Sequence, residues 1–259
     1  TDYQVAFDKV QQAIRRGDTY LANLTFATKV LTSLSLRDII ERARAPYRFY
    51  WKDKCAFFSP ESFIKIQGQQ IKSFPMKGTI RAEVPHAAAR LLADAKERAE
   101  HATITDLIRN DLSRVAEKVR VKRYRYVEEI EHSEGKLLQT STEIVGELPN
   151  NYQDHLGDML MKLLPAGSIS GAPKTRTVEI LADAEAGPRG YYTGVLGYFD
   201  GKNLDSAVAI RFLEQKGKDL WYKSGGGLTH FSQAKAEYEE LIQKVYLPFR
   251  YKNKPLSTY

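Results

Sequence analysis

The stretch from Glu61 to Phe74 constrains the fold more than any other part of the chain. Apolar and polar residues alternate along it, and Gln67-Gly68-Gln69 interrupts the alternation. A period of two is typical of half-buried strands, so we expect two antiparallel strands joined by a tight turn. This strand pair leads directly into Pro75-Met-Lys-Gly-Thr79.

The segment Pro75–Thr79 is predicted to turn tightly and to present Lys77. Proline has a fixed φ and glycine tolerates unusual φ, so Pro75 and Gly78 let the backbone bend and approach a ligand closely. A lysine held in this way can act as a nucleophile. A surface lysine at the end of a hairpin gives the same local pattern, so both interpretations stand at this point.

The composition indicates a globular protein with a substantial core. The chain has 259 residues, of which 42% are hydrophobic and 11% aromatic. It has neither an apolar run of the roughly 18 residues that a membrane span needs nor an N-terminal hydrophobic signal core. We therefore expect a cytoplasmic protein that does not bind membranes.

Cysteine and histidine usage narrows the choice of metal. Cys55 is the only cysteine, which excludes an internal disulfide and a zinc site built from several cysteines. The five histidines are scattered without paired ligand spacing, which argues against zinc or iron. Mg²⁺ bound by carboxylates remains open.

The formal charge of +7 suggests an anionic partner, either a nucleic acid or a small acid. Residues 118–126 interleave basic and aromatic side chains, as some nucleic-acid-binding strands do. A solvated strand with Val119 and Val121 directed inward gives the same pattern, and acidic residues follow at once. We favour sheet structure here and expect no nucleic-acid binding.

The remaining periodicity predicts one α+β domain over residues 1–259, with large antiparallel sheets and helices outside them. Helices are expected at 3–16, 36–44, 85–101, 103–116, 152–163, 173–181 and 232–245. Strands are expected at 20–31, in several pieces up to 74, at 119–131 and 137–148, and as three strands between 190 and 221, separated by Asp200-Gly201 and Lys216-Gly217.

Acidic residues share faces on two of the predicted helices. Glu237, Glu240 and Lys244 lie on one flank of the last helix, and Glu97 and Glu100 share a face of an earlier one. If the two helices met, four carboxylates would surround a site suited to Mg²⁺. Two solvated faces, with an ordinary i,i+4 ion pair, explain the same spacing.

Two glycine-rich segments are candidates for anion binding. Ser224-Gly-Gly-Gly227 follows a predicted strand, and its free N–H groups would hold a carboxylate or phosphate, although a flexible hairpin turn explains it equally well. The segment Gly167–Thr175 is not a nucleotide loop, because Ala172 and Pro173 separate its lysine from the last glycine.

Eight motifs occur together in one order and resemble the chorismate-binding enzymes, which include anthranilate, aminodeoxychorismate, isochorismate and salicylate synthases. The resemblance runs from about residue 17 to about residue 248 and implies two large facing antiparallel sheets with helices outside. The motifs are Pro75-Met-Lys-Gly-Thr79, Lys96-Glu-Arg-Ala-Glu-His101, Asp106-Leu-Ile-Arg-Asn-Asp111, Gly167-Ser-Ile-Ser-Gly-Ala-Pro-Lys174, Tyr192-Thr-Gly194, Ala209-Ile-Arg211, Gly225-Gly-Gly227 and Ala236-Glu-Tyr-Glu-Glu240.

Within this family, residue 77 separates members. Anthranilate synthases have Pro-Ile-Ala-Gly-Thr at this motif, whereas component I of aminodeoxychorismate synthase has Pro-Ile-Lys-Gly-Thr. The lysine implies that Lys77 attacks C2 of chorismate and expels the C4 hydroxyl, after which ammonia adds at C4 and displaces the lysine. The implied product is 4-amino-4-deoxychorismate, the precursor of p-aminobenzoate and folate.

The resemblance also implies catalytic and metal-binding roles. Glu61 would be the general acid/base that protonates the departing hydroxyl. Glu100 and Glu240 would bind Mg²⁺, with Glu97 and Glu237 as outer or alternative ligands. Ammonia would come from a separate glutamine amidotransferase subunit, because the sequence around the single cysteine lacks the glycine-flanked elbow of such a nucleophile.

Seven further residues are expected beside the substrate: Thr79, Ser170, Tyr192, Arg211, Gly225, Gly227 and Lys244. By the resemblance, Arg211 and Tyr192 would hold the enolpyruvyl carboxylate, since a planar guanidinium grips a carboxylate with two hydrogen bonds. The two glycine amides and Lys244 would assist Mg²⁺ at the ring carboxylate. This dianionic ligand would account for the basic charge without a nucleic acid.

Three features depart from the family pattern. Residues 138–143 read Leu-Gln-Thr-Ser-Thr-Glu where many relatives have His-His-Leu-Val-Ser-Thr, so Gln139 replaces an active-site histidine and leaves Glu61 as the only obvious acid/base. Ser113 replaces a common glycine. The chain is also N-terminally short relative to full-length relatives, so we expect no tryptophan feedback, and Thr1 leaves the native start open.

Three alternative functions remain at this point. The first is anthranilate synthase component I or another chorismate-derived activity, against which Lys77 argues. The second is a catalytically reduced protein of the same fold, which the glutamine at position 139 keeps open. The third is a basic nucleic-acid-binding module, which chorismate turnover would exclude.

Overall fold

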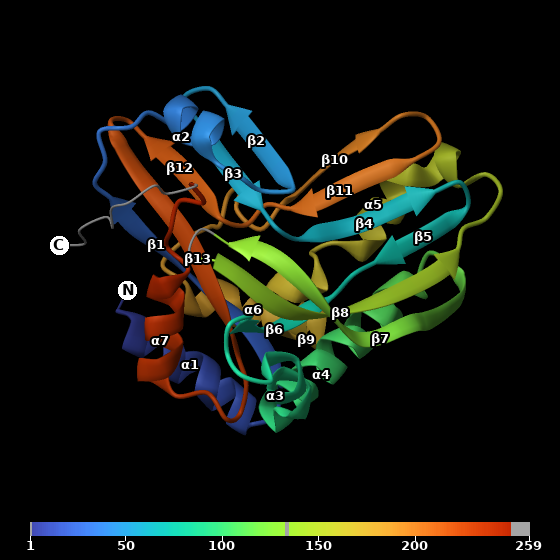
Figure 1. Cartoon of the computed structure of the whole chain (residues 1–259), viewed down its shortest axis with the longest axis horizontal. Coiled ribbons are helices and arrows are strands. Elements are labelled where there is room, and N and C mark those ends of the chain that lie inside the picture. The colour runs from blue at the N-terminus through green and yellow to red at the C-terminus, as the bar shows by residue number, and fades with distance from the viewer. Residues whose placement is uncertain (1, 133–134, 250–259) are drawn as a thin grey trace.

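Two antiparallel sheets form the framework of the computed structural model, which describes residues 2–132 and 135–249 (Figure 1). The first sheet has the strand order β2-β3-β12-β13-β1-β9, and the second has the order β10-β11-β4-β5-β8-β6, with β7 paired to β8. The predicted α+β class with two antiparallel sheets is confirmed.

The strands are β1 (Leu21–Val30), β2 (Tyr47–Trp51), β3 (Cys55–Ser59), β4 (Ser62–Gln67), β5 (Gln70–Ser73), β6 (Met76–Arg81), β7 (Glu117–His132), β8 (Gly135–Glu147), β9 (Gly171–Ala172), β10 (Val195–Phe199), β11 (Leu204–Val208), β12 (Phe212–Lys216) and β13 (Asp219–Leu228). The helices are α1 (Tyr3–Arg15), α2 (Leu36–Arg42), α3 (Ala87–Ala93), α4 (Ala95–Leu112), α5 (Leu156–Leu163), α6 (Lys174–Ala184) and α7 (Ala234–Gln243), with short 3₁₀ turns η1 (Tyr152–His155) and η2 (Gly167–Ile169).

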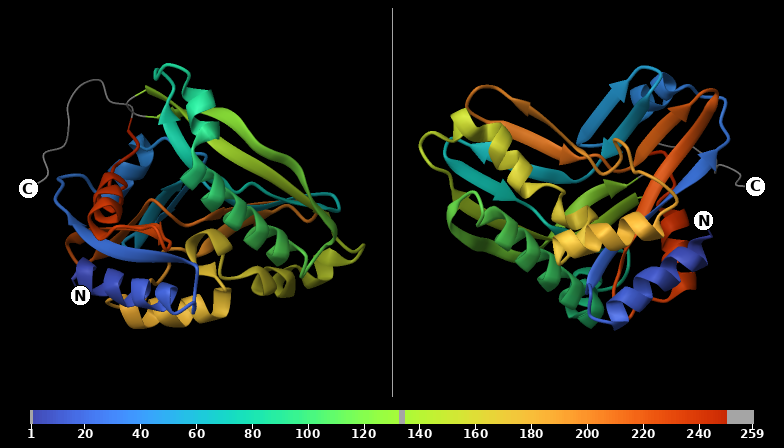
Figure 2. Two further views of the ribbon diagram at one scale, coloured as in Figure 1. Left: turned by 90° about the horizontal axis from the view of Figure 1, so that it is seen from below. Right: turned by 180° about the vertical axis from the view of Figure 1, so that it is seen from behind.

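Each sheet buries one face against helices. Leu24 and Leu228 of the first sheet pack against Val10 of α1 and Leu241 of α7, and the second sheet packs against α4 and α5. The view from behind in Figure 2 shows α1, α4, α5 and α6 lying across the back of the sheets. In the part of the chain that the structure describes, no helix is both long and apolar enough to cross a membrane.

The predicted strand pair between Glu61 and Phe74 is confirmed as the β4–β5 hairpin. Lys65, Ile66 and Gln67 pair with Lys72, Ile71 and Gln70, and the turn lies at Gly68, which has φ +58°. Ile66 and Ile71 are fully buried on one face, as the alternation requires.

The predicted bounds of the helices between 85 and 116 are wrong. α3 ends at Ala93, because Asp94 has an extended backbone (φ −62°, ψ 117°) and its carboxylate accepts a hydrogen bond from the Glu97 N–H. This N-cap starts α4, which then runs without interruption through the predicted break. The cap therefore places Glu97 and Glu100 in the first two turns of one helix.

The prediction of three strands between 190 and 221 is also wrong, because the middle one is two strands in different sheets. β11 belongs to the second sheet and β12 to the first. The chain crosses between them at Ala209–Arg211, and Arg211 takes φ +51°. The crossing places Arg211 where the two sheets meet.

Two strands are longer or less regular than expected. The run Gly225–Gly227 lies inside β13, paired with β1, which rules out the hairpin turn that was one of two open interpretations. β7 has irregular pairing at three places and positive φ at Lys118 and Arg125, which disrupts its alternation. The strand itself is as predicted and Val119 packs against the core, but Val121 is 37% exposed instead of inward.

Lys77 lies in a bulged strand and not in a tight turn. Met76, Lys77 and Thr79 oppose Ser141, Thr140 and Gln139, so Gly78 is an extra residue in β6. Gly78 has φ +74°, and a Cβ there would lie 3.0 Å from Glu97 Oε2 and 3.1 Å from Leu91 Cδ1. The backbone conformation therefore favours glycine beside Lys77, and a larger residue would also have to displace the side chain of Glu97 or Leu91.

We expect Gly78→Ala to lower the free energy of unfolding more than Gly68→Ala does. Gly68 has a similar φ of +58° but nothing within 4 Å of its added Cβ, so its substitution should cost about 1–2 kcal/mol for the left-handed backbone alone. Gly78→Ala should cost about 1 kcal/mol more because Glu97 and Leu91 must move. Urea unfolding measures both, and equal losses would contradict the crowding argument.

Candidate active site

A cavity of about 1220 Å³ lies between the two sheets and is lined from both of them. Its walls come from β6, β7, β8 and α4 on one side and from β13, α7 and the Arg211 crossing on the other. Nine of the residues predicted from the sequence line it: Lys77, Thr79, Glu97, Glu100, Arg211, Gly227, Glu237, Glu240 and Lys244.

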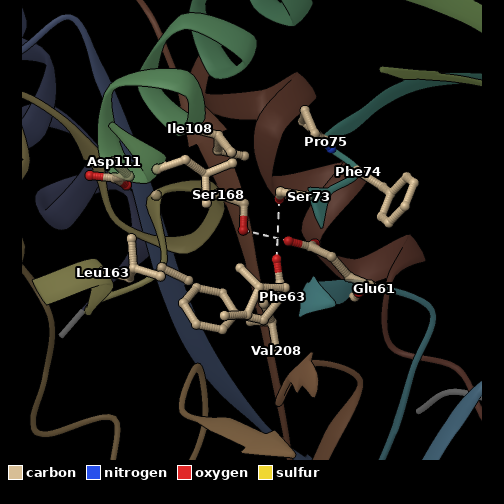
Figure 3. A pocket seen from close by; sticks show the side chains of 15 residues that line it. Glu61, Phe63, Ser73, Phe74, Pro75, Ile108, Asp111, Leu163, Ser168 and Val208 are labelled. Atoms are coloured by element: carbon tan, nitrogen blue, oxygen red, sulfur yellow. Dashed lines mark hydrogen bonds between the residues drawn. The ribbon is translucent and has the colours of Figure 1, made fainter. Parts of the chain in front are cut away.

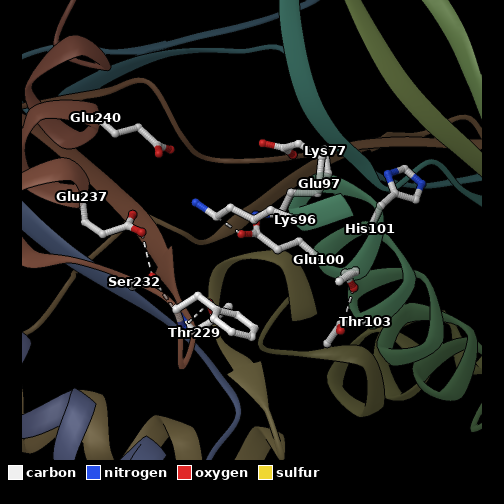
Figure 4. Close-up of polar contacts among 12 residues, drawn as sticks. Lys77, Lys96, Glu97, Glu100, His101, Thr103, Thr229, Ser232, Glu237 and Glu240 are labelled. Carbon is white, nitrogen blue, oxygen red and sulfur yellow. Dashed lines mark hydrogen bonds and ion pairs between the residues drawn. The ribbon is translucent and has the colours of Figure 1, made fainter. Parts of the chain in front are cut away.

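Carboxylates from two helices face each other across this cavity. Figure 4 shows Glu97 and Glu100 projecting from α4 toward Glu237 and Glu240 of α7. Burial raises the pKa of Glu97, and the charge of Glu100 raises it further. Burial likewise raises the pKa of Glu237, to which the charge of Glu240 adds.

Two lysines lie among these carboxylates. Lys77 Nζ is 3.4 Å from Glu100 Oε2, and Lys96 Nζ is 3.8 Å from Glu100 Oε1. As the side chains stand, no three His, Cys, Asp or Glu residues among those described are close enough to share a metal ion. Carboxylate oxygens that line one cavity are nevertheless the donors that a hard divalent cation prefers, so the chemistry of this donor set fits Mg²⁺.

Lys77 reaches from the second sheet toward the first. Its Nζ lies 3.5 Å from the point that a Cβ of Gly227 would occupy, so the ammonium group lies against this part of β13. Nearby, Lys244 Nζ donates to the Gly225 carbonyl at 3.0 Å and pairs with Glu240 Oε1 at 2.7 Å. Burial lowers the pKa of Lys244 despite this pairing.

Glu61 lines a second, small cavity (Figure 3). It does not line the large cavity, although the preceding residue, Pro60, does. The hydroxyl of Ser168, in η2, donates a hydrogen bond to Glu61 Oε1. Burial raises the pKa of Glu61, although Ser168 and the charges of Lys77 and Arg211 oppose the shift. A raised pKa favours the protonated carboxyl group, which is the form that donates a proton.

Arg211 is held over an aromatic ring at the wall of the large cavity. Its guanidinium carbon lies 5.3 Å from the centroid of the Tyr246 ring, and its Nε donates to the Tyr246 hydroxyl at 3.3 Å. Stacking of this kind orients the guanidinium plane and leaves its other N–H groups to bind an anion.

Three predicted substrate-binding residues do not line the large cavity. Ser170 is buried, and its hydroxyl donates to the Ala166 carbonyl at 2.9 Å. Tyr192 is buried against Phe212, with ring centroids 5.9 Å apart. The Gly225 carbonyl accepts a hydrogen bond from Lys244 Nζ, and Gly225 is not among the residues that line the large cavity. Their predicted contacts with substrate stay predictions.

A buried histidine lies behind Lys77. His101 on α4 is fully buried between Thr140 and Thr142 of β8. Burial, together with the positive charges of Arg125 and Lys77, lowers the pKa of His101 to about 4. Its ring is therefore neutral at physiological pH.

Sequence reasoning missed three polar residues at the site. Lys96 lies among the carboxylates, and Ser168 binds Glu61 from the glycine-rich segment in which only Ser170 was predicted to contact the substrate. Glu128 on β7 opposes Gln139 and lines the large cavity with it, and the Ser141 hydroxyl donates to its carboxylate. Glu128 and Ile130 are two residues apart and therefore share a face of the strand. This spacing was the sequence signal that could have placed Glu128 beside the cavity.

The chain resembles known proteins along nearly its whole length. A model of the chorismate binding enzyme family matches residues 1–250. An uncharacterized PabA-like protein of Pasteurella multocida is 54% identical over 246 residues, which cover 95% of this chain and 76% of that protein. The crystal structure of anthranilate synthase component I from Streptococcus pneumoniae superimposes with a TM-score of 0.82 at 28% identity, covering 94% of this chain and 56% of that one.

Two synthases with different products are almost equally similar. Anthranilate synthase component 1 of Methanothermobacter thermautotrophicus is 34% identical over 253 residues. Aminodeoxychorismate synthase component 1 of Bacillus subtilis is 31% identical over 259 residues. The alignments cover 92% and 94% of this chain but only 53% and 54% of the two synthases, so the chain spans about half their length.

We expect Glu61→Gln to be more stable than the wild type at neutral and alkaline pH. The folded pKa of Glu61 is raised, so its contribution to stability is complete below the unfolded pKa and is lost as pH rises through the folded value. Glutamine keeps the neutral form at every pH. The stability difference in urea unfolding should vanish below about pH 4.5, and a difference that does not change with pH would contradict the assignment.

Proposed function

Because the chain belongs to the chorismate binding enzymes, we propose that it aminates chorismate at C4 to give 4-amino-4-deoxychorismate, a precursor of p-aminobenzoate and folate. The reaction would proceed through a covalent adduct with Lys77. This assignment makes the chain equivalent to component I of an aminodeoxychorismate synthase.

The observation that carries the proposal is the position of Lys77. The bulge at Gly78 holds Lys77 at the wall of the large cavity, with its side chain only 28% exposed. Its Nζ lies between the carboxylates of α4 and the glycine strand β13. A primary amine at this place can reach the ring of a substrate whose carboxylates are held on either side.

The cavity offers separate binding groups for two carboxylates of chorismate. Arg211, stacked on Tyr246, would bind the enolpyruvyl carboxylate from the sheet junction. Lys244 and the backbone of Gly227 would bind the ring carboxylate from the other side. Glu100 and Glu240 would hold Mg²⁺, with Glu97 and Glu237 as outer or alternative ligands, and the metal would supply positive charge to that same carboxylate.

The proton balance places Glu61 in both half-reactions. The neutral amine of Lys77 attacks C2, both ring double bonds shift, and the C4–O bond breaks as Glu61 donates a proton to the departing hydroxyl, which leaves as water. Ammonia then attacks C4, both double bonds shift back, and the C2–N bond to Lys77 breaks, which returns the neutral amine. The Glu61 carboxylate takes the proton that ammonia releases, so the enzyme is regenerated.

Ammonia would come from a separate glutamine amidotransferase subunit. The two synthases of known product are each named component 1. Cys55, the single cysteine of this chain, is buried in β3, and burial raises the pKa of its thiol. Such a thiol is a poor nucleophile for glutamine hydrolysis.

We expect the protein to convert chorismate, Mg²⁺ and ammonium into 4-amino-4-deoxychorismate, identified by mass. Without ammonia, incubation with chorismate should leave a covalent adduct that is detected by mass, and Lys77→Ala should abolish it. Lys72→Ala is the control and should retain the adduct, because Lys72 lies on the preceding strand β5 and does not line the cavity. Anthranilate with released pyruvate, or isochorismate formed without ammonia, would sink the assignment. An unchanged rate in Lys77→Ala would remove the covalent step, and absence of turnover would favour a catalytically reduced protein.

We expect Glu240→Gln to lower Mg²⁺-dependent activity at least roughly tenfold, or about 1.4 kcal/mol, because it removes a charged ligand. Glu239→Gln is the matched control, since Glu239 is exposed on the same helix and does not line the cavity. Titration of activity with Mg²⁺ measures the effect. Full activity in excess EDTA would contradict the metal role.

A further inference from the structure

We propose that Thr140 and His101 are positioning residues for Lys77, joined in one directed chain of hydrogen bonds that ends on the Lys77 carbonyl. The inference rests on the proposed role of Lys77 as the attacking amine. It concerns the backbone of Lys77, to which the Thr140 side chain donates a hydrogen bond.

The chain of hydrogen bonds ends next to the bulge. Thr140 on β8 lies directly opposite Lys77, and its hydroxyl donates to the Lys77 carbonyl oxygen. Thr140 is fully buried, so water does not compete for this bond. Because Gly78 interrupts the ladder immediately after Lys77, a side-chain donor at this carbonyl restrains the peptide that joins Lys77 to the bulge.

Proton counting sets the direction of the chain. The Thr140 hydroxyl has one proton and gives it to Lys77, so His101 Nδ1, 3.4 Å away, must donate to Thr140. Thr142 Oγ1 accepts from the Arg125 backbone N–H at 3.0 Å, and its own proton is directed to His101 Nε2 at 2.6 Å. Nε2 is therefore the acceptor of the ring and Nδ1 its donor. All four bonds point the same way and strengthen one another.

The hydrogen-bond chain begins at Arg125, and the Arg125 side chain is anchored on α3. This helix also packs against the bulge at Gly78. The guanidinium of Arg125 donates to the carbonyls of Leu91 and Leu92, at 3.2 and 3.1 Å, near the end of α3. Leu91 is also the residue whose side chain would meet a Cβ on Gly78. The peptide at the bulge is therefore held from β8 through a hydroxyl and from α3 through packing.

The Thr140 hydroxyl thus restrains the backbone of the residue that is proposed to attack chorismate. Reaction rates depend steeply on the placement of a nucleophile, and a misplacement of about 1 Å can cost about a hundredfold. Loss of the bond should therefore act on the chemical step more than on substrate binding.

Thr140→Val removes the hydroxyl at nearly constant volume. We expect it to slow formation of the Lys77–chorismate adduct by about tenfold or more, with a fall in kcat and little change in KM. Thr140→Ser retains the hydroxyl and should restore most of the rate. Thr103→Val is the matched control, because its hydroxyl also donates to a backbone carbonyl of α4, that of Ala99 at 3.0 Å, but on the exposed surface.

A second measurement tests the direction of the hydrogen-bond chain in the absence of substrate. The ¹⁵N NMR spectrum of histidine-labelled protein, assigned with His101→Asn, should show His101 as the neutral tautomer protonated at Nδ1. Thr140→Val should perturb that resonance, whereas Thr103→Val should leave it unchanged. A ring protonated at Nε2 would overturn the proposed direction of the chain.

The rate data separate this inference from the proposed function. If Lys77→Ala abolishes the adduct while Thr140→Val forms it at the wild-type rate, the positioning role is wrong and the covalent mechanism stands. If Lys77→Ala retains adduct formation or turnover, the covalent mechanism fails, and with it the positioning of an attacking amine. A loss in Thr140→Val that Thr140→Ser does not restore would show a packing defect and would also overturn the inference.

Discussion

Between β6 and β8 the ladder accommodates one extra residue, Gly78, and the arrangement of the site follows from that irregularity. The left-handed backbone at Gly78 and its contacts with Glu97 and Leu91 join the strand to α3 and α4. Because the bulge directly follows Lys77, it breaks the regular alternation of side chains where the lysine enters the cavity. The helix that carries Glu97 and Glu100 is thereby packed against the strand that carries the proposed nucleophile.

Charge balance is the second constraint on the cavity. Four glutamates line it from α4 and α7, and their mutual repulsion and burial raise the pKa of Glu97 and Glu237. Lys77, Lys96 and Lys244 offset part of that charge through contacts with Glu100 and Glu240. Arg44, Arg81 and Arg211 line other parts of the cavity, so the carboxylates outnumber the basic groups only at the α4–α7 wall. A substrate carboxylate approaching that wall would be repelled unless a cation such as the proposed Mg²⁺ were bound there.

Local sequence patterns predicted the existence of helices and strands better than the residues at which they end or the strands with which they pair. The β4–β5 hairpin followed from alternation and a turn signal, both of which act over a few residues. The break at Asp94 was missed because the cap competes with an otherwise helical sequence. The glycine run in β13 was taken for a possible turn, yet its pairing with β1 makes it strand, and a Cβ at Gly225 would lie 2.9 Å from the Leu24 carbonyl. Sheet pairing overrides local propensity in such places.

The sequence by itself determined the family and the identity of the lysine, because ordered motifs and residue types do not depend on coordinates. It also determined which helix faces are acidic, since helical periodicity assigns residues to faces. Only the tertiary structure decided that these faces share a cavity, that Arg211 lies at the crossing between sheets, and that Ser168, Glu128 and His101 support the site. Those contacts join residues far apart in the chain, and only the packing of sheets and helices brings such residues together.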